Sequence, residues 1–271
     1  MLKTNNNPNL IFIHANGFPP NSYSQLFKNF KNDFRINNFI LRPLWDKKEN
    51  FKIVKDWTIF HNDFIKSLNN IDDVIGMGHS IGGNIILRSA LSHPNKFSKL
   101  ILLDPTLFIP KIILGWKIFS KLGLQKKIHP WINSTLTRKM IYNNDDEIFK
   151  SYRRKKVFSK IKDENLKIYI RSITKESGGK LHITYPKDWE YQIYKTGLIA
   201  DMFIWENVKY LDIPCLIIRA ENSNAFLDSS EKKIRSLNPK IKFIKLKEST
   251  HLFPLEFPDK TFDIIQNFLL V

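Results

Sequence analysis

The sequence predicts an α/β protein with a mostly parallel, doubly wound sheet and a helical segment inserted into its second half. Short apolar runs of β type alternate with amphipathic helical patterns over the first 105 residues, as in strand–helix–strand repeats. The alternation stops between residues 105 and 207 and returns near the carboxyl end. A chain of 271 residues is long enough for one core domain that carries such an insertion.

The first part of the chain supplies the predicted strand–helix repeats. Apolar runs of β type place strands at 10–14, 34–41, 73–77 and 100–103. Apolar side chains at helical spacing place helices at 21–32, 53–68 and 82–92. In the second of these helices, Trp57, Phe60 and Phe64 recur at intervals of three and four residues. Strands joined by helices in this order pair in parallel.

The second part divides into an insertion and a return to the core pattern. Residues 106–205 hold helical patterns, several Trp and Tyr residues and the turn Ser177-Gly178-Gly179, and this segment is too long to be a loop. Strands follow at 215–219 and 240–246, and a closing helix at 259–270. We therefore expect residues 1–105 and 206–271 to form the core and residues 106–205 to form a helical cap.

A nucleophile motif lies between the third predicted strand and the helix after it. Gly78-His79-Ser80-Ile81-Gly82 has the pattern G-x-S-x-G, which places a serine in a strained strand-to-helix turn. Glycines flank the serine because side chains there would collide with neighbouring backbone. The amino end of the helix presents backbone N–H groups to a developing oxyanion. The motif and its context predict Ser80 as a nucleophile.

A second motif follows the first predicted strand, and the two motifs together resemble the α/β-hydrolase superfamily. The run His14-Ala15-Asn16-Gly17-Phe18 is similar to the H-G-x-G or H-G-F segment of that family, although Ala15 stands where glycine is usual. The resemblance extends over the whole chain and implies the α/β-hydrolase fold with an inserted cap. It also implies an oxyanion hole formed by the backbone N–H groups of Asn16 and Ile81, with Phe18 as the alternative to Asn16.

A serine hydroxyl needs an imidazole within hydrogen-bond reach to take its proton. Of the seven histidines, His251 follows the last predicted strand and precedes the closing helix. The order serine, acid, histidine along the chain is that of α/β-hydrolases. We therefore expect His251 to be the general base.

The resemblance leaves the acid open among three carboxylates. Most members of the superfamily carry it after the penultimate strand, where this chain reads Ala220-Glu221-Asn222 and has no aspartate at the expected place. Some members carry it after the preceding strand, and Asp104 lies there, 24 residues after Ser80. We expect Asp104 to orient His251, with Glu221 and then Asp228 as alternatives.

This constellation predicts a serine hydrolase that cleaves a carboxylic ester or thioester of a small acyl compound through an acyl-serine intermediate. Residues 106–124 are strongly apolar and favour a helix packed on the core; an acyl-binding wall for medium-length chains, or an interfacial membrane helix, is the alternative. C–C bond hydrolysis and hydroxynitrile-lyase-type chemistry use the same constellation. A non-catalytic ligand-binding protein on this fold is the alternative from another class.

Composition limits the partners that we expect. The net charge of +17 raises the question of nucleic acid or anionic membrane, but the basic residues are scattered and no nucleic-acid-binding module is recognisable. We expect no nucleic acid, and weak association with an anionic membrane surface stays open. No cofactor or metal is implied, since the mechanism requires none and no cluster has ligand spacing. Without a secretory signal or an apolar run of roughly 20 residues, the expected location is the cytoplasm.

Overall fold

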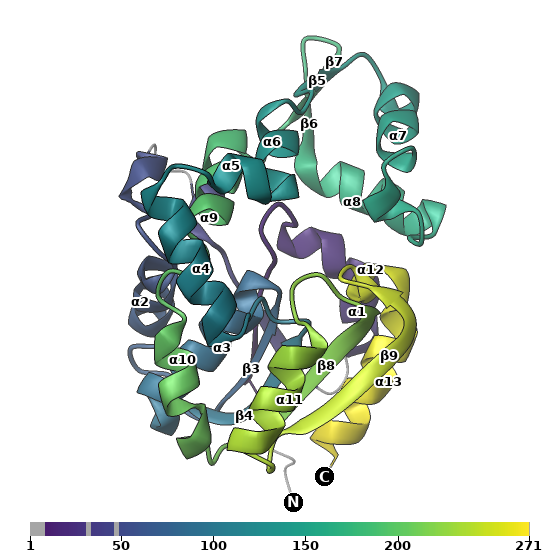
Figure 1. The fold of residues 1–271 in the computed structure, drawn as a ribbon. Coiled ribbons are helices and arrows are strands. Elements are labelled where there is room, and N and C mark those ends of the chain that lie inside the picture. Colours follow the sequence, from purple (N-terminus) through teal and green to yellow (C-terminus); the bar gives the residue numbers. More distant parts are fainter. Residues whose placement is uncertain (1–8, 31–33, 46–48, 271) are drawn as a thin grey trace, which may run out of the picture.

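A six-stranded sheet forms the centre of the computed structural model, which describes residues 9–30, 34–45 and 49–270 (Figure 1). In spatial order the strands are β2 (Arg35–Phe39), β1 (Asn9–Ile13), β3 (Val74–His79), β4 (Phe97–Leu103), β8 (Cys215–Asn222) and β9 (Lys242–Thr250). All neighbouring strands of this sheet pair in parallel. The predicted α/β class with a parallel, doubly wound sheet is confirmed.

Helices cover both faces of the sheet because its central strands β1, β3, β4 and β8 are buried on both sides. In β1, Leu10 and Phe12 belong to one buried cluster, whereas Ile11 and Ile13 belong to the other. Helices on the Ile13 side are α2 (Thr58–Ser67), α3 (Ile81–Ser92) and α11 (Asp228–Leu237). Helices on the other side are α1 (Ser24–Phe27), α12 (Phe253–Glu256) and α13 (Pro258–Leu269).

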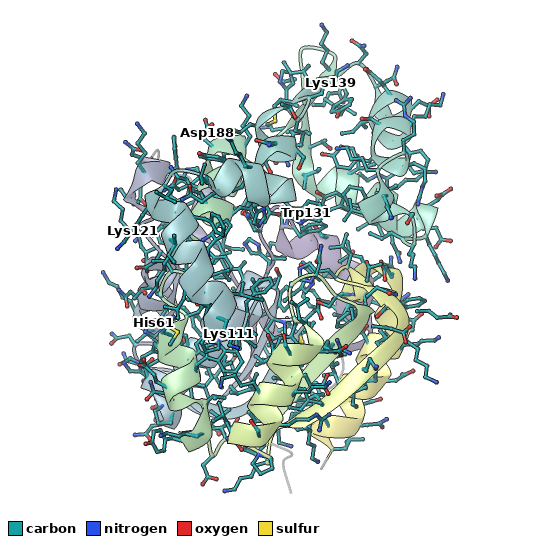
Figure 2. All side chains as sticks on the ribbon, viewed as in Figure 1. His61, Lys111, Lys121, Trp131, Lys139 and Asp188 are labelled. Atoms are coloured by element: carbon teal, nitrogen blue, oxygen red, sulfur yellow. The ribbon has the colours of Figure 1, made fainter. Side chains whose placement is uncertain are left out.

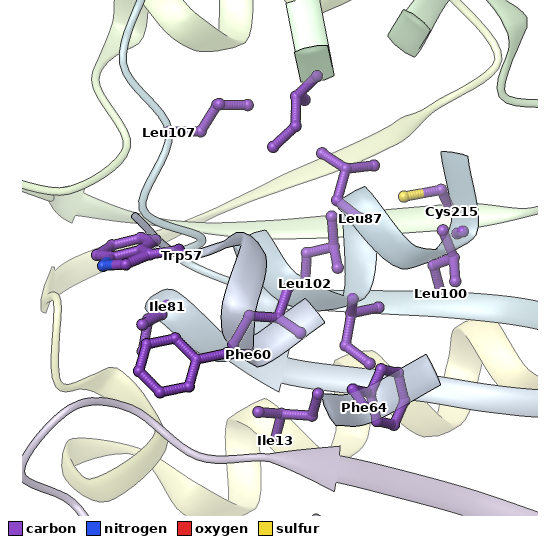
Figure 3. Packing of buried hydrophobic residues seen from close by; sticks show 14 of the residues in the cluster. Ile13, Trp57, Phe60, Phe64, Ile81, Leu87, Leu100, Leu102, Leu107 and Cys215 are labelled. Atoms are coloured by element: carbon purple, nitrogen blue, oxygen red, sulfur yellow. The ribbon is translucent and has the colours of Figure 1, made fainter. Parts of the chain in front are cut away.

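Figure 3 shows the packing on the Ile13 side, where aromatic side chains of α2 lie against the strands. Phe60 and Phe64 are fully buried and belong to the same cluster as Leu102 of β4. Cys215 at the start of β8 joins this cluster, and burial raises the pKa of its thiol. The thiol is therefore a small apolar core group.

The segment between β4 and β8 contains seven α-helices, two 3-10 turns and a small second sheet. The helices are α4 (Pro110–Lys121), α5 (Gln125–Ile128), α6 (Pro130–Leu136), α7 (Asp145–Arg153), α8 (Asp163–Ile173), α9 (Lys187–Thr196) and α10 (Met202–Asn207). Figure 1 shows α5–α9 at the top of the view, whereas α4 and α10 run alongside the core helices. The division at residues 105 and 206 stays a prediction. Among the described residues, no helix is both long and apolar enough to cross a membrane.

The small sheet of the insertion was not predicted. Its antiparallel strands lie in the order β5 (Ile141–Tyr142), β7 (Lys180–Ile183) and β6 (Thr174–Ser177). Gly178 and Gly179 form the two-residue turn between β6 and β7, with φ of 58° and 69°. Such a turn requires positive φ at both positions, which explains the glycine pair.

Two predicted helices differ from those in the structure. The segment 21–32 becomes a 3-10 turn (Pro20–Tyr23), the single turn of α1 and a second 3-10 turn (Lys28–Phe30), and residues 31 and 32 lie outside the described residues. The helix predicted at 53–68 begins as a separate 3-10 turn (Phe51–Ile53), and α2 proper starts at Thr58. Side-chain periodicity locates the buried face in both cases, but it does not distinguish 3-10 from α-helical turns.

Candidate active site

Ser80 occupies a tight turn between β3 and α3. Its backbone has φ of 58° and ψ of −120°, a conformation that is strained for a residue with a side chain. The glycines around it permit close backbone approach: a Cβ on Gly82 would lie 2.1 Å from the carbonyl oxygen of Ile13, and one on Gly78 would lie 2.4 Å from the Gly82 backbone. The turn therefore holds Ser80 at the carboxyl edge of the sheet.

Three side chains that the sequence analysis selected form a continuous hydrogen-bonded relay. The Oγ of Ser80 lies 2.9 Å from Nε2 of His251, and Nδ1 of His251 lies 2.7 Å from Oδ2 of Asp104. An ionised carboxylate only accepts hydrogen bonds, so Nδ1 carries the proton and Nε2 accepts from the serine hydroxyl. The His251 side chain is 21% exposed, whereas Asp104 is fully buried.

Asp104 is held in place by donors from the neighbouring strand β8 and from the residue that follows it. Its Oδ1 accepts the backbone N–H of Ala220 at 2.9 Å, and its Oδ2 also accepts the hydroxyl of Ser223 at 2.6 Å. These hydrogen bonds replace the hydration that a buried carboxylate loses. Since β4 lies between β3 and β8, a carboxylate at the end of β4 is beside Ser80 and within reach of His251.

The two alternative acids lie elsewhere. Glu221 is exposed, and its carboxylate accepts the backbone N–H of Glu248 at 2.8 Å. Asp228 is 72% exposed and forms an ion pair with Arg219 at 2.6 Å. In the described part of the chain, neither carboxylate is hydrogen-bonded to His251, so the structure brings Asp104 alone of the three carboxylates to the imidazole.

The predicted oxyanion loop follows β1. The N–H of Phe18 donates to the carbonyl of Ala15 at 3.1 Å and closes a turn, which leaves the N–H of Asn16 as the candidate donor. Ile81 is the first residue of α3, where backbone N–H groups have no partner within the helix. The two N–H groups thus come from the places where the resemblance puts the two halves of an oxyanion hole.

Buried His14 fixes this loop from the core side. Its Nε2 accepts the N–H of Leu41 at 3.2 Å, and its Nδ1 donates to the carbonyl of Ala15 at 2.8 Å. Burial lowers the pKa of His14 to about 4, so the ring is neutral near pH 7 and can make one bond as acceptor and one as donor.

A second hydrogen-bonded chain connects the loop to His251, and the sequence analysis did not find it. The hydroxyl of Tyr23 accepts the N–H of Ala15 at 3.3 Å and donates to Nδ1 of His79 at 2.7 Å. Nε2 of His79 then donates to the backbone carbonyl of His251 at 2.8 Å. Burial, with a smaller effect of nearby His251, lowers the pKa of His79 well below its usual range. The neutral ring therefore links the loop to the base.

Thr106 also contacts the nucleophile, although nothing in its spacing singled it out. Its Oγ1 lies 3.1 Å from Ser80 Oγ, and its backbone N–H donates to the Ser80 carbonyl at 3.0 Å. Because the serine hydroxyl donates to His251, the Thr106 hydroxyl donates to the serine oxygen. Thr106 thereby restricts the rotation of the Ser80 side chain.

Residues of the insertion hold the oxyanion loop from the other side. The side-chain amide of Asn16 donates to the carbonyl of Glu190 at 3.1 Å, and its oxygen accepts the hydroxyl of Tyr185 at 3.0 Å. Gly17, with φ of 79°, lies against the Glu190 carboxylate, so an added Cβ would be 3.3 Å from Oε1. The carboxylate pairs with Arg138 at 2.6 Å. Burial raises the pKa of Glu190, and Arg138 opposes that shift.

This arrangement contains the groups that acyl transfer requires: a hydroxyl nucleophile, an imidazole that can take its proton, an orienting carboxylate, and N–H donors on a fixed loop and a helix end. The structure brings Ser80, His251 and Asp104 together, and Ile81 follows Ser80 as the first residue of α3. Among the described residues, no group of three or more His, Cys, Asp and Glu side chains is placed to hold a metal ion.

Comparison with known proteins places the chain among α/β-hydrolases. A family model described as the Ndr family matches residues 63–270. A type I acyl-CoA thioesterase of Penicillium brevicompactum is 25% identical over 160 residues, which are 53% of this chain and 35% of that protein. The chain therefore spans about a third of the length of this curated relative.

Solved structures support the same fold. E-2-(acetamidomethylene)succinate hydrolase superposes with a TM-score of 0.78 at 18% identity, covering 97% of this chain and 92% of that one. The thioesterase domain from the curacin biosynthetic pathway superposes with a TM-score of 0.73 at 14% identity, covering 96% and 91%. At this identity, the similarity establishes the α/β-hydrolase fold and leaves the reaction to the site itself.

Proposed function

This chain belongs to the Ndr family within the α/β-hydrolase superfamily, and from that premise we propose that it is a serine hydrolase acting on a carboxylic ester or thioester. The observation that carries the proposal is the relay from Ser80 through His251 to Asp104, with distances of 2.9 and 2.7 Å. A serine in ordinary surroundings is a weak nucleophile, and this relay is the arrangement that activates it.

The relay supports the following acylation step. Ser80 Oγ attacks the substrate carbonyl carbon while its proton passes to Nε2 of His251. Asp104 holds the other ring nitrogen and stabilises the imidazolium that results. The carbonyl oxygen becomes an oxyanion, which the N–H groups of Ile81 and Asn16 stabilise, and each such donor contributes about 10²–10³ in rate. The tetrahedral intermediate then collapses, and His251 returns the proton to the leaving alcohol or thiol.

Deacylation uses the same groups a second time. Water attacks the acyl-serine ester, and Nε2 of His251 takes its proton. When the second tetrahedral intermediate collapses, that proton returns to Ser80 Oγ and the carboxylic acid is released. The carboxylate of Asp104 stays ionised throughout, because its role is to orient and stabilise the imidazole.

Thioesters belong in the proposed substrate class for two reasons. An acyl-serine mechanism cleaves an oxygen or a sulfur leaving group with the same residues. The matching thioesterase of Penicillium brevicompactum supports an acyl thioester as a natural substrate, within the partial length that the alignment covers. An acyl chain of medium length remains our working hypothesis for the acid part.

Hydrolysis of p-nitrophenyl esters and acyl-CoA thioesters, from acetyl to palmitoyl, tests the proposal in wild type and Ser80→Ala. We expect turnover by the wild type and a loss of at least about 10³-fold in kcat for Ser80→Ala. The variant lacks the nucleophile but keeps the residues that bind the substrate. A fluorophosphonate should label the wild type at Ser80 and leave the variant unlabelled.

Ser67→Ala serves as a matched control, since it makes the same substitution in α2, where the hydroxyl donates to the backbone carbonyl of Phe64 at 2.7 Å. That variant should retain turnover within a few-fold. Labelling and turnover that persist in Ser80→Ala would contradict the proposal. No turnover on either series, with an unlabelled wild type, would favour a ligand-binding protein instead.

A further inference from the structure

Helix α4 presents an apolar ridge to solvent. Leu114, Ile118 and Leu122 are 54%, 59% and 64% exposed, and Phe119 beside them is 41% exposed. We call these four residues the α4 ridge. Leu114, Ile118 and Leu122 are four residues apart, so they lie on one face of the helix. Exposed aliphatic residues that gather on one helix face mark an interaction surface more often than isolated ones do.

The ridge is not the face by which α4 packs on the protein. Ile113 is fully buried and Trp116 is 8% exposed, and both come from the opposite side of the helix. The ridge is therefore apolar surface in addition to what the fold uses. Packing on the core does not account for it.

The chain segment that contains the ridge is basic. Lys111 and Lys121 are exposed at the two ends of α4, and Figure 2 shows Lys121 at the outer edge of the molecule. Lys117 is half-buried between them. The sequence from Pro105 to Asn144 contains seven Lys and Arg residues and no Asp or Glu. A surface that combines large apolar side chains with basic residues complements an anionic lipid headgroup layer.

We propose that the α4 ridge docks the protein on the surface of an anionic phospholipid bilayer. The helix lies parallel to the membrane plane, with Ile118 and Leu122 at the boundary between headgroups and acyl chains. Lys111 and Lys121 extend their ammonium groups to lipid phosphates. At 12 residues, α4 is too short to span a bilayer, so docking at the surface is the geometry available to it.

A second copy of the chain is a weaker candidate for the same surface. Two α4 ridges facing each other across a two-fold axis would bring Lys111, Lys117 and Lys121 of both copies together. No acidic residue between 105 and 144 would neutralise them, so the like charges would repel. An anionic membrane turns the same lysines into favourable contacts.

Co-sedimentation with lipid vesicles tests the proposal on the full chain. The probes are vesicles of phosphatidylcholine alone and vesicles in which about a third of the lipid is phosphatidylglycerol. We expect wild type to bind the anionic vesicles, with a partition coefficient that falls as salt rises. Ile118→Asp with Leu122→Asp should lower it at least about tenfold. Lys111→Gln with Lys121→Gln should lower it about 25-fold, about fivefold for each lysine.

Matched controls carry the same chemical changes on other surfaces. Lys245→Gln with Lys247→Gln removes two exposed lysines from β9, and Leu270→Asp adds a charge at a side chain that is 80% exposed after α13. Both should bind within about twofold of wild type if docking is specific to α4. Ser80→Ala should bind like wild type, so a failure of the proposed hydrolase activity leaves this test unaffected.

Three outcomes would overturn the proposal. The first is equal binding to neutral and anionic vesicles, and the second is no binding to either. The third is a lipid-free dimer, seen by size exclusion with light scattering, that dissociates in the Ile118→Asp, Leu122→Asp variant. That last result would assign the ridge to a second copy of the chain. Circular dichroism should show an unchanged fold for the lysine, isoleucine and leucine variants, because all the side chains substituted in them are exposed.

Discussion

Both oxygens of the Asp104 carboxylate accept hydrogen bonds from donors other than His251. Ala220 N–H reaches Oδ1, and the Ser223 hydroxyl shares Oδ2 with the imidazole. These three hydrogen-bond partners are all donors, so the site requires an acceptor at both oxygens. This requirement separates Asp104 from Glu221, whose carboxylate is exposed and accepts one backbone N–H of Glu248.

Asp104→Asn should therefore reduce kcat by about 10⁴ near neutral pH. An amide NH₂ that faces Nδ1 favours the tautomer with the proton on Nε2, which can no longer accept the proton of Ser80. Kinetics on the preferred ester at pH 7 measure the effect, with circular dichroism as the check on folding. Glu221→Gln and Asp228→Asn are the matched controls and should keep kcat within a few-fold. A collapse of kcat in Glu221→Gln with normal Asp104→Asn would reassign the acid.

The residues that sequence reasoning found differ in kind from those it missed. Ser80 lies in a local motif, and His251 and Asp104 were selected because they follow particular strands. Tyr23 and His79 are 56 residues apart, and their hydrogen bond depends on the packing of two elements. Tyr23 fits the apolar spacing of its helix, so its hydroxyl carries no sequence signal. A local sequence pattern can identify a catalytic residue, whereas a contact between residues far apart in the chain becomes visible only in the structure.

At the scale of elements, the oxyanion loop is positioned from two sides. His14 and Tyr23 hold it on the core, and Tyr185 and the Glu190 carbonyl hold the Asn16 side chain from the insertion. The geometry of the proposed oxyanion donor therefore depends on the insertion as well as on the sheet.

Tyr185→Phe should lower kcat about tenfold and leave KM within about twofold. The substitution removes the hydroxyl that fixes the Asn16 side chain, so the N–H of Asn16 loses part of its alignment, and full loss of one donor is worth about 10²–10³. Tyr152→Phe is the matched control, because Tyr152 is also buried but its hydroxyl has no hydrogen-bond partner among the described residues. Equal kcat values for the two variants would show that Tyr185 does not position the loop.

Alanine substitution at two helical glycines should change the free energy of unfolding in opposite directions. In Gly82→Ala the new Cβ would lie 2.1 Å from the Ile13 carbonyl oxygen, so β1 and α3 must separate, at a cost of about 1–3 kcal/mol in the free energy of unfolding. Gly115 of α4 has nothing within 4 Å of an added Cβ, and alanine there should stabilise the helix by about 0.5–1 kcal/mol. Urea unfolding followed by circular dichroism measures both. A destabilised Gly115→Ala would mean that this helix face is already covered.

The elements that could be predicted are those with a buried apolar side. Strands β1, β3 and β8 consist mostly of buried apolar residues, so composition identifies them. In the sequence of α11, DSSEKKIRSL, Ile234 and Leu237 are the apolar side chains, too few for a recognisable period. The strands of the small sheet are two to four residues long, and β6 is exposed and polar. Short polar strands carry no periodic signal that a sequence alone could reveal.

At the scale of the whole molecule, the buried titratable side chains make the free energy of unfolding depend on pH. His14 and His79 are fully buried and neutral; the pKa of His14 falls to about 4, and that of His79 falls well below its usual value, in both cases chiefly through burial. Asp201, fully buried beside Arg88 of α3 at 3.5 Å, has the opposite shift, because burial raises its pKa to about 6. The histidines favour folding at neutral pH, and Asp201 favours it at acid pH.

The free energy of unfolding should therefore fall as the pH falls below about 6.5. Between that pH and about 4, each histidine binds a proton in the unfolded chain and not in the folded one, which lowers stability by about 1.4 kcal/mol per pH unit per group. Burial also lowers the pKa values of His61 and His129 to about 4, so four histidines contribute to this loss. Asp201 offsets one of the four below about pH 6, and Glu190, whose pKa burial also raises, offsets part of another, which leaves a net slope of about two to three groups.

Urea unfolding from about pH 7.5 to about pH 4.5 measures this slope, and His79→Gln should reduce it by about 1.4 kcal/mol per pH unit, because the amide can replace a hydrogen bond but does not titrate. The slope is the informative quantity, since loss of the Tyr23 contact lowers the stability of His79→Gln at every pH. Stability that rises in acid would mean that the buried carboxylates, and not the buried imidazoles, govern how this fold responds to protons.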